Sequence, residues 1–307
     1  MARRGGWGCA AGVLLAAVVL AVVLVGVLIL DWVGSDPESP PAGPPYGSAS
    51  VACEVQDPRI LESSGLAVVA DTWYTVNDSA QQLEIYVLDT DCTVREVLTY
   101  PQIDPVDVED LAVSADGDLW VADTGDNYAR RPEVALYRIP DRGAGTPTTL
   151  RLAYDDGAHD VETLLLSPED VPYLVTKTSS GNSRVYAPAG ELDPDGLTMM
   201  TQVAAVQFVL TGTAGGPASF VGQLMATGGS VAPDGDRFVV RTYTDAYVWD
   251  LDGTDVLGAL REETPRRVAL PATPQGEAIS LTADAGEMYS TTEGSPFPVH
   301  VQRRTDQ

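Results

Sequence analysis

The chain has 307 residues, with 44 Asp and Glu residues against 18 Lys and Arg residues, which gives a formal net charge of −26 at pH 7. A surface this acidic repels phosphate backbones and anionic lipid headgroups, so nucleic acid is excluded as a partner. The charge favours solubility and attracts cations, although a solvated acidic face is a plainer interpretation than a specific cation function.

The first thirty residues predict a membrane anchor. Arg3 and Arg4 lie close to the start, and residues 10–30 then contain neither a charge nor a proline. Twenty-one residues at about 1.5 Å each span about 31 Å, the thickness of a hydrocarbon core. Because the arginines precede this span, we predict a cytoplasmic N-terminus over residues 1–9 and a transmembrane signal anchor over residues 10–32. The protein would then be a single-pass protein of the cell membrane with its C-terminal domain outside the cytoplasm. A cleaved signal peptide is the alternative.

A linker follows the anchor. Residues 33–48 are rich in proline, glycine and serine, a composition that favours an extended, semi-rigid spacer. The remaining residues, 49–307, are long enough for one large domain with a hydrophobic core. This domain has two cysteines, Cys53 and Cys92, and in an oxidising compartment they allow a single disulfide, which we predict.

The domain repeats one short phrase five times. Each copy is a mostly apolar run that ends near a hairpin turn, such as Ser114–Asp118 with its Asp-Gly pair. A second run that contains an aromatic residue, such as Trp120, follows the turn. The five phrases are Ser64–Val68, Glu109–Val113, Glu162–Leu166, Gly229–Ala232 and Glu277–Leu281.

The spacing of these phrases indicates the fold class. Successive phrases begin 45, 53, 67 and 48 residues apart, and repeats of about 40–50 residues built from four short strands are typical of β-propeller blades. We therefore predict an all-β domain, a five-bladed β-propeller, with a sixth blade in the longest interval as the alternative. We expect residues 49–55 to close the ring by pairing with the strand near Val299–Val301.

Polar residues recur where the first strand of each blade begins and the second strand ends, and both positions lie at one mouth of the central channel. Glu109, Glu162 and Glu277 open three of the phrases, whereas Ser64 and Gly229 open the other two. We expect an acidic ring at this mouth, because a packed core would have apolar residues there. The ends of the second strands add Asn77, Asp78, Asp123, Lys177, Arg241 and Glu293.

Three carboxylates on one ring cannot all stay ionised without compensation. One solution is a hard cation such as Ca²⁺, held by the three glutamates with Asn77, Asp78 or Asp123 as further oxygen ligands. The other is neutralisation by Lys177, the only lysine of the chain, and by Arg241. The two solutions compete because fixed positive charges disfavour a metal ion, and the residues alone leave both open.

A series of short motifs runs through the domain in a fixed order: Glu62–Ala67, Asn77–Ser79, Val108–Ala112, Gly125–Asn127, Thr227–Gly229, Arg241–Ala246 and Gln275–Ile279. In this order they resemble a family of secreted or membrane-anchored β-propellers that is common in actinobacteria. More distantly, the predicted fold is similar to phytase-like esterase and gluconolactonase-type propellers. That resemblance implies calcium in the channel mouth and hydrolysis of esters or lactones there.

Two functions follow from these patterns. We favour a binding or scaffolding module that takes a small-molecule or protein ligand at the acidic channel mouth. The alternative is a Ca²⁺-dependent hydrolase of phosphate esters, esters or lactones, in which a glutamate acts as base. Only Glu109, Glu162 and Glu277 correspond to the acidic channel position of the hydrolytic propellers, and Lys177 and Arg241 depart from a pure calcium ring.

Overall fold

The computed structural model describes residues 45–217, 219–234 and 236–305. These residues belong to one unit, Pro44–Gln307. The predicted cytoplasmic N-terminus, the signal anchor and most of the linker lie outside them. Within the described residues, no helix is both long and apolar enough to cross a membrane.

The described residues form four β-sheets. One sheet contains β2 (Ser63–Val69), β3 (Thr72–Asn77), β4 (Leu83–Leu88) and β5 (Val94–Tyr100). A second contains β14 (Ala226–Val231), β15 (Arg237–Thr242), β16 (Asp245–Asp250) and β17 (Arg266–Ala269). A third contains β18 (Ile279–Leu281), β19 (Glu287–Ser290), β20 (Phe297–Arg303) and β1 (Ser50–Val55).

The fourth sheet has eight strands, because two runs of four strands are joined along their outer edges. The first run is β6 (Val108–Val113), β7 (Leu119–Asp123), β8 (Val134–Ile139) and β9 (Thr148–Tyr154). The second run is β10 (Val161–Leu166), β11 (Pro172–Thr176), β12 (Asn182–Pro188) and β13 (Leu197–Gln207). Strands β9 and β13 pair in parallel, from Arg151 opposite Leu197 to Tyr154 opposite Met200.

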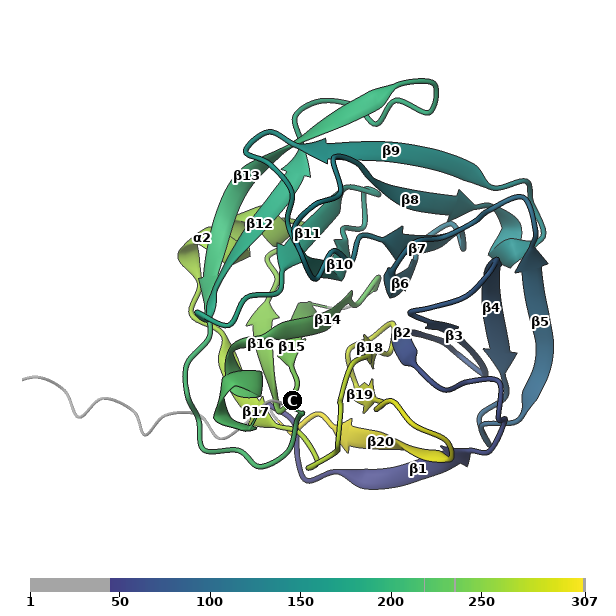
Figure 1. Ribbon diagram of the computed structural model, residues 1–307. Coiled ribbons are helices and arrows are strands. Elements are labelled where there is room, and N and C mark those ends of the chain that lie inside the picture. The colour runs from purple at the N-terminus through teal and green to yellow at the C-terminus, as the bar shows by residue number, and fades with distance from the viewer. Residues whose placement is uncertain (1–44, 218, 235, 306–307) are drawn as a thin grey trace, which may run out of the picture. The chain divides into compact units, whose positions relative to one another are not determined.

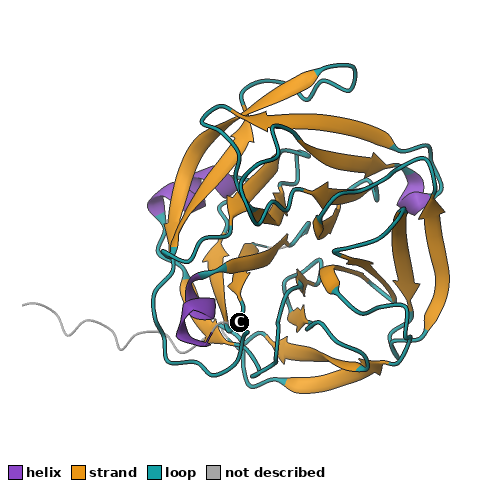
Figure 2. Cartoon of the chain, viewed as in Figure 1, coloured by secondary structure: helices purple, strands orange, loops and turns teal. Residues whose placement is uncertain are grey.

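The strands have a propeller-like arrangement. Each run of four strands leads outwards from a common centre, and β2, β6, β10, β14 and β18 lie innermost (Figure 1). The helical segments of the described residues are confined to connections between strands (Figure 2). They are η1 (Asp141–Gly143), η2 (Ser219–Leu224) and α2 (Val256–Glu262).

Local sequence explains why the chain folds back so often. After β6, the Ser114 N–H donates to the Asp118 carbonyl at 2.9 Å, and Gly117 adopts a φ of 91°, a left-handed conformation that glycine tolerates best. Strand β10 is buried at every position, whereas the outer strand β5 exposes Arg95 and Glu96. The alternation of turns and short apolar runs therefore produces meandering strands from a buried centre to a solvated edge.

The hydrophobic core is divided into five clusters, counted over the described residues, and each lies between neighbouring runs of strands. In one of them, Trp120 and Leu136 pack with Leu164 and Tyr186 of the next run. Burial between sheets therefore continues around the whole arrangement, which is how a propeller covers both faces of every sheet.

The N-terminal strand closes the ring. Strand β1 pairs antiparallel with β20, with Val51 opposite His300, which confirms the predicted closure. Cys53 of β1 is bonded to Cys92, and their Cα atoms are 5.8 Å apart. Tyr46 is buried and its hydroxyl donates to the Ala285 carbonyl at 2.7 Å. The first described residues are therefore held by three different parts of the domain.

Candidate functional site

The acidic residues stand where the innermost strands begin. Glu109 is the second residue of β6 and Glu162 the second residue of β10, and the pairing register shifts at each of them. Such a shift marks a β-bulge, which turns a side chain out of the regular pleat. Glu277 lies two residues before β18. Three glutamates at the starts of three different innermost strands therefore lie at one mouth of the channel.

The structure corrects one assignment of the repeat. Strand β14 has its bulge at Thr227, between Ala226 and Gly228, so Thr227 rather than Gly229 is equivalent to Glu109. Two consecutive glycines leave no side-chain pattern from which the register can be counted, which explains the two-residue error. Ser64 does occupy the equivalent bulge in β2.

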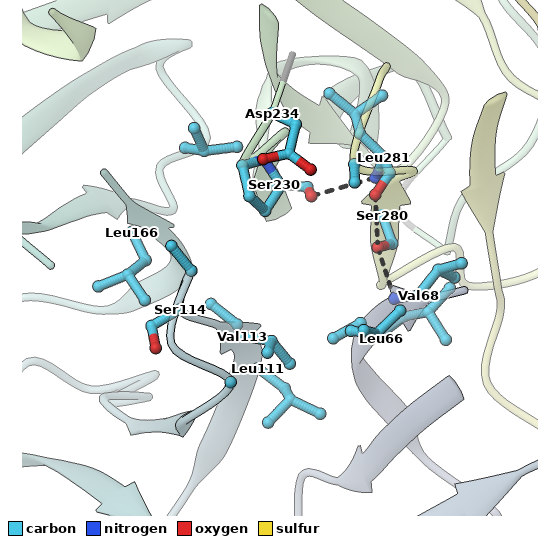
Figure 3. A pocket seen from close by; sticks show the side chains of 18 of the residues that line it. Leu66, Val68, Leu111, Val113, Ser114, Leu166, Ser230, Asp234, Ser280 and Leu281 are labelled. Atoms are coloured by element: carbon cyan, nitrogen blue, oxygen red, sulfur yellow. Dashed lines mark hydrogen bonds between the residues drawn. The ribbon is translucent and has the colours of Figure 1, made fainter. Parts of the chain in front are cut away.

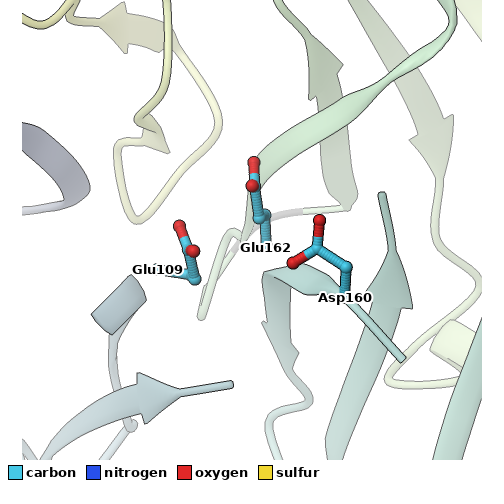
Figure 4. Close-up of side chains that lie close together, drawn as sticks. All are labelled: Glu109, Asp160 and Glu162. Atoms are coloured by element: carbon cyan, nitrogen blue, oxygen red, sulfur yellow. The ribbon is translucent and has the colours of Figure 1, made fainter. Parts of the chain in front are cut away.

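Four carboxylates form the acidic cluster of this mouth: Glu109, Asp160, Glu162 and Glu277. Ligand oxygens of Glu109, Asp160 and Glu162 all lie within 4.8 Å of one another (Figure 4). The Glu277 charge raises the pKa of both Glu109 and Glu162, which places it in the same group. Lys177 forms a salt bridge with Glu162, and its Nζ lies 5.2 Å from the Tyr243 ring centroid.

Burial dominates the electrostatics of the cluster. The three glutamates are 3–6% exposed. Burial, reinforced by neighbouring carboxylates, raises the pKa of Glu109 and Glu162 well above its usual range, and burial raises the pKa of Glu277 to about 7. Burial by itself lowers the pKa of Lys177, but the charges of Glu162 and Glu277 outweigh burial, so the pKa of Lys177 is raised overall. The cluster therefore has more carboxyl groups than its one lysine can neutralise, and ionisation of all of them together is unfavourable without a further positive charge.

Sequence reasoning missed Asp160 and its counterpart Asp107. Both stand two residues before a cluster glutamate, in the repeated triplet Asp-Val-Glu at residues 107–109 and 160–162. That repetition was the available signal. Burial raises the pKa of Asp107 as well, with the Asp160 charge as the next contribution. A Cβ at Gly125 would lie 2.1 Å from Glu109 Oε1, so only glycine lets this loop approach the cluster.

Arg241 does not neutralise the ring through direct contact. Its buried guanidinium donates to backbone carbonyls at distances of 2.7–3.3 Å, those of Thr242, Tyr243, Ala278 and Thr291. Burial lowers the pKa of Arg241 to about 10, and the Glu277 charge opposes that shift. Arg241 therefore joins β15 to the β18 and β19 region, because a buried arginine needs acceptors for its N–H groups and backbone carbonyls supply them.

Asn77 and Asp123 also act in the scaffold. The Asn77 side chain accepts hydrogen bonds from the Leu61 and Glu62 N–H groups at 3.1 Å. Asp123 accepts from the backbone N–H of Asp107 at 3.0 Å and forms a 2.9 Å salt bridge with Arg131. These side chains hold the loops that carry site residues, so they are not free to be ligands.

Asp78 and Glu293 belong to a second acidic group, together with Glu62. Burial, with Glu62 as the next contributor, raises the pKa of Asp78 to about 7. Burial and the Glu62 charge raise the pKa of Glu293 in the same way. The Glu293 charge also raises the pKa of Glu277. The second group therefore borders the acidic cluster without being part of it.

Two carboxylate oxygens of the cluster have no hydrogen-bond partner among the described residues. Glu162 Oε2 and Glu277 Oε2 are buried and accept no hydrogen bond from the described residues. Buried polar atoms without a partner are rare, and each calls for an explanation such as an ion. The donor set consists of carboxylate oxygens, which suit hard cations such as Ca²⁺. The residues therefore fit a cation, whereas the Lys177 ammonium competes with it.

An open polar pocket of about 490 Å³ borders the cluster, and Asp160 and Lys177 line it. His159 also lines this pocket, and its Nε2 lies 2.8 Å from Asp156 Oδ1 and 2.8 Å from the Tyr186 hydroxyl. A ligand of the cluster would therefore have solvent access on this side. His159 was not among the residues predicted for the site.

Comparisons with known proteins give a fold likeness only. No family model matches the chain, and no curated protein matches it either. Solved structures similar to it include a gluconolactonase from Xanthomonas campestris, 17% identical, with a TM-score of 0.45 over 79% of this chain and 72% of that one. Another is the PQQ-bound aldose sugar dehydrogenase from Streptomyces coelicolor, 12% identical, with a TM-score of 0.45 over 85% of this chain and 99% of that one. A further one, described as a putative gluconolactonase, is 13% identical, with a TM-score of 0.43 over 76% of this chain and 71% of that one.

Proposed function

We propose that the protein is a membrane-anchored, extracytoplasmic five-bladed β-propeller that binds a divalent cation, and through it an oxygen-rich ligand, at the acidic channel mouth. The count of five blades rests on five successive runs of four strands and five core clusters between them. The anchor and the location rest on the apolar span and its preceding arginines.

The cation is supported by one observation above all. Oxygens of Glu109, Asp160 and Glu162 lie within 4.8 Å of one another, and Glu162 Oε2 has no partner among the described residues. Ca²⁺ binds oxygen ligands at about 2.3–2.6 Å, so opposed ligands lie about 4.6–5.2 Å apart. Oxygens within 4.8 Å of one another can therefore share one such ion. The number of buried carboxylates favours Ca²⁺ over Mg²⁺, which binds through only one or two carboxylates and keeps several waters.

The binding function is supported by the polar pocket beside the cluster. Asp160 and Lys177 face both the cluster and the pocket. A cation held by a few carboxylates from one side keeps coordination positions for water or for ligand oxygens. We therefore propose a small ligand that bears hydroxyl, carboxylate or phosphate oxygens. The acidic surface disfavours polyanions such as nucleic acid.

Hydrolysis of esters, lactones or phosphate esters is the second candidate function. The observation that favours it is the raised pKa of Glu277. A general base works best with a pKa near the operating pH, and burial raises the pKa of Glu277 to about 7. When bound, a cation would supply polarisation of a carbonyl or phosphoryl oxygen. Glu277 would accept the proton of the attacking water, and Lys177 would orient an anionic group of the substrate.

Thermal unfolding of the full chain tests the cation site. A ligand present at a hundred times its dissociation constant stabilises the folded state by about 2.7 kcal/mol. Millimolar Ca²⁺ should therefore raise the melting temperature relative to EDTA, and Glu162→Gln should remove most of that response. Glu133→Gln, in the surface salt bridge with Arg151, is the matched control and should keep the response. A wild-type melting temperature that is the same in Ca²⁺ and EDTA rejects the cation.

An activity screen separates the two functions. Generic esters, lactones and phosphomonoesters are incubated with the full chain in Ca²⁺ and in EDTA. Hydrolysis that needs Ca²⁺ and is lost in Glu277→Gln supports the hydrolase. Ca²⁺-dependent stabilisation without turnover of any of these substrates supports the binding module.

A further inference from the structure

The central channel has a second mouth, at the end where the innermost strands finish. A cavity of about 240 Å³ lies there (Figure 3). Apolar side chains from all five innermost strands line it: Leu66 of β2, Leu111 and Val113 of β6, Leu166 of β10, Val231 of β14 and Leu281 of β18. The two mouths therefore differ completely in chemistry, since one gathers carboxylates and the other gathers aliphatic carbon.

Two serine hydroxyl groups in the cavity wall already accept hydrogen bonds from the backbone. Ser230 Oγ accepts a hydrogen bond from the Leu281 N–H at 3.1 Å, and Ser280 Oγ accepts one from the Val68 N–H at 3.0 Å. These bonds connect neighbouring innermost strands across the channel wall (Figure 3). Their acceptor oxygens serve the fold, so the interior presents mainly an aliphatic surface to a ligand.

The rim of the cavity carries one charge of each sign. Arg142 and Asp234 both line it, and both are exposed. Hydrated charges of opposite sign give no net attraction for an ion, and the chain as a whole is strongly acidic. The cavity therefore selects by shape and apolar contact rather than by charge.

We propose that this cavity binds a compact, uncharged apolar molecule, such as a medium-chain alcohol. An apolar cavity of about 150 Å³ stays dry and takes up benzene, so about 240 Å³ has room for roughly ten non-hydrogen atoms by the same proportion. Burial of such a molecule removes the aliphatic wall and the ligand from water together, which is the driving force for its binding. The site is separate from the acidic mouth and does not depend on the function proposed there.

A homologous series of ligands tests the proposal. The full chain is titrated calorimetrically with 1-butanol, 1-hexanol and 1-octanol. Each methylene that enters the cavity should tighten binding about fourfold. Octanoate and octylamine should bind at least tenfold more weakly than 1-octanol, because a charged head would have to lose water at an apolar wall. An affinity independent of chain length, or equal binding of a charged analogue, overturns the proposal.

Cavity-filling variants locate the binding. Val113 of β6 and Val231 of β14 are partly exposed and line the cavity, so Val113→Trp and Val231→Trp should fill the space. Each should weaken 1-octanol binding at least tenfold. Val97→Trp, on the outer strand β5, is the matched control and should bind as wild type does. Any alcohol binding that remains in the two tryptophan variants measures non-specific uptake by the preparation.

Leu166→Ala tests the same site by enlarging the cavity instead of filling it. It enlarges the cavity, so the longest alcohol that still gains affinity should become longer than in the wild type. Circular dichroism and melting temperatures establish that each variant is folded. Unchanged octanol affinity in both tryptophan variants, or an unchanged length limit in Leu166→Ala, would show that the alcohol binds elsewhere.

Discussion

Lys177 makes the only salt bridge that reaches the acidic cluster within the described residues, and it is nearly buried itself. Its partner Glu162 lies beside Glu109, Asp160 and Glu277, so one ammonium group stabilises several carboxylates at once. Desolvation of the Lys177 ammonium offsets much of its attraction to the carboxylates. The lysine therefore stabilises the fold mainly in comparison with a cluster that has no positive charge at all.

Replacement of this charge should therefore be costly. In EDTA at neutral pH, Lys177→Met should lower the free energy of unfolding by about 3–5 kcal/mol, because it leaves Glu162 buried without a partner. Urea denaturation measures the change. Arg184→Met breaks the exposed salt bridge with Asp156 and should cost at most about 1 kcal/mol. If Ca²⁺ occupies the cluster, Lys177→Met should also bind it more tightly, since a competing positive charge is gone. Equal losses in the two variants would contradict the role given to Lys177.

The raised pKa of Glu277 predicts a pH dependence of stability. Burial raises this pKa from its ordinary value of 4.5 to about 7 in the folded protein. Between these values the folded state binds more protons than the unfolded state, so stability should fall as pH rises from about 4.5 to about 7. Glu277→Gln should make that slope shallower by the amount that corresponds to the uptake of about one proton. Denaturation in EDTA across this range is the measurement, and a wild-type stability that rises over the range would contradict the assignment.

At the scale of elements, Asp110 joins three innermost strands. Its carboxylate is fully buried and accepts from the Leu111 and Leu164 N–H groups at 2.8 Å and from the Gly229 N–H at 3.2 Å. Strands β6, β10 and β14 therefore share one acceptor. Burial raises the pKa of Asp110 well above its usual range, while the three N–H groups oppose that shift.

Loss of this acceptor should loosen the centre of the ring. Asp110→Ala leaves three buried N–H groups without a partner, at about 1–3 kcal/mol each, so the free energy of unfolding should fall by at least about 3 kcal/mol. Ser280→Ala removes one acceptor, that of the Val68 N–H, and should cost about 1 kcal/mol. Chemical denaturation compares the two. A loss in Asp110→Ala no larger than in Ser280→Ala would mean that water or a backbone shift replaces the carboxylate.

At the scale of the whole molecule, closure of the ring depends on a strand from the opposite end of the chain. Strand β1 completes the sheet of β18, β19 and β20, and the disulfide between Cys53 and Cys92 ties it to the neighbouring sheet. An open ring would leave two sheet edges and one apolar face without a neighbour.

The disulfide should contribute measurably to that closure. It joins residues 39 positions apart, for which the loop-entropy estimate is about 3–4 kcal/mol. The double variant Cys53→Ser/Cys92→Ser should lose this amount of stability, and reduction of the wild type by dithiothreitol should reproduce the loss. A change below about 1 kcal/mol in both experiments would show that pairing of β1 with β20 suffices by itself.

The repeat in the amino-acid sequence was sufficient to predict the propeller-like arrangement and its closure. Short apolar runs separated by turns specify strands locally, and a phrase that recurs at blade length specifies how they are grouped. The same repeat predicted that Glu109, Glu162 and Glu277 meet, because equivalent positions of equivalent strands meet at the channel. Oxygens of Glu109 and Glu162 do lie within 4.8 Å of each other. Where the repeat lost its side chains, at Gly228 and Gly229, the register was predicted wrongly.

Only the tertiary structure decided which polar residues serve the site and which serve the scaffold. Arg241 and Lys177 occupy similar places in the repeat, yet one donates to backbone carbonyls and the other to Glu162. Asp123 and Asp160 are both carboxylates near the channel mouth, yet they are engaged differently. Both oxygens of Asp123 have partners, namely backbone N–H groups, the Tyr137 hydroxyl and Arg131. Asp160 accepts one backbone hydrogen bond through Oδ1, from the Asp126 N–H, and lies within reach of Glu109 and Glu162. The difference depends on hydrogen-bond partners from distant segments, and a pattern within one strand carries no information about them.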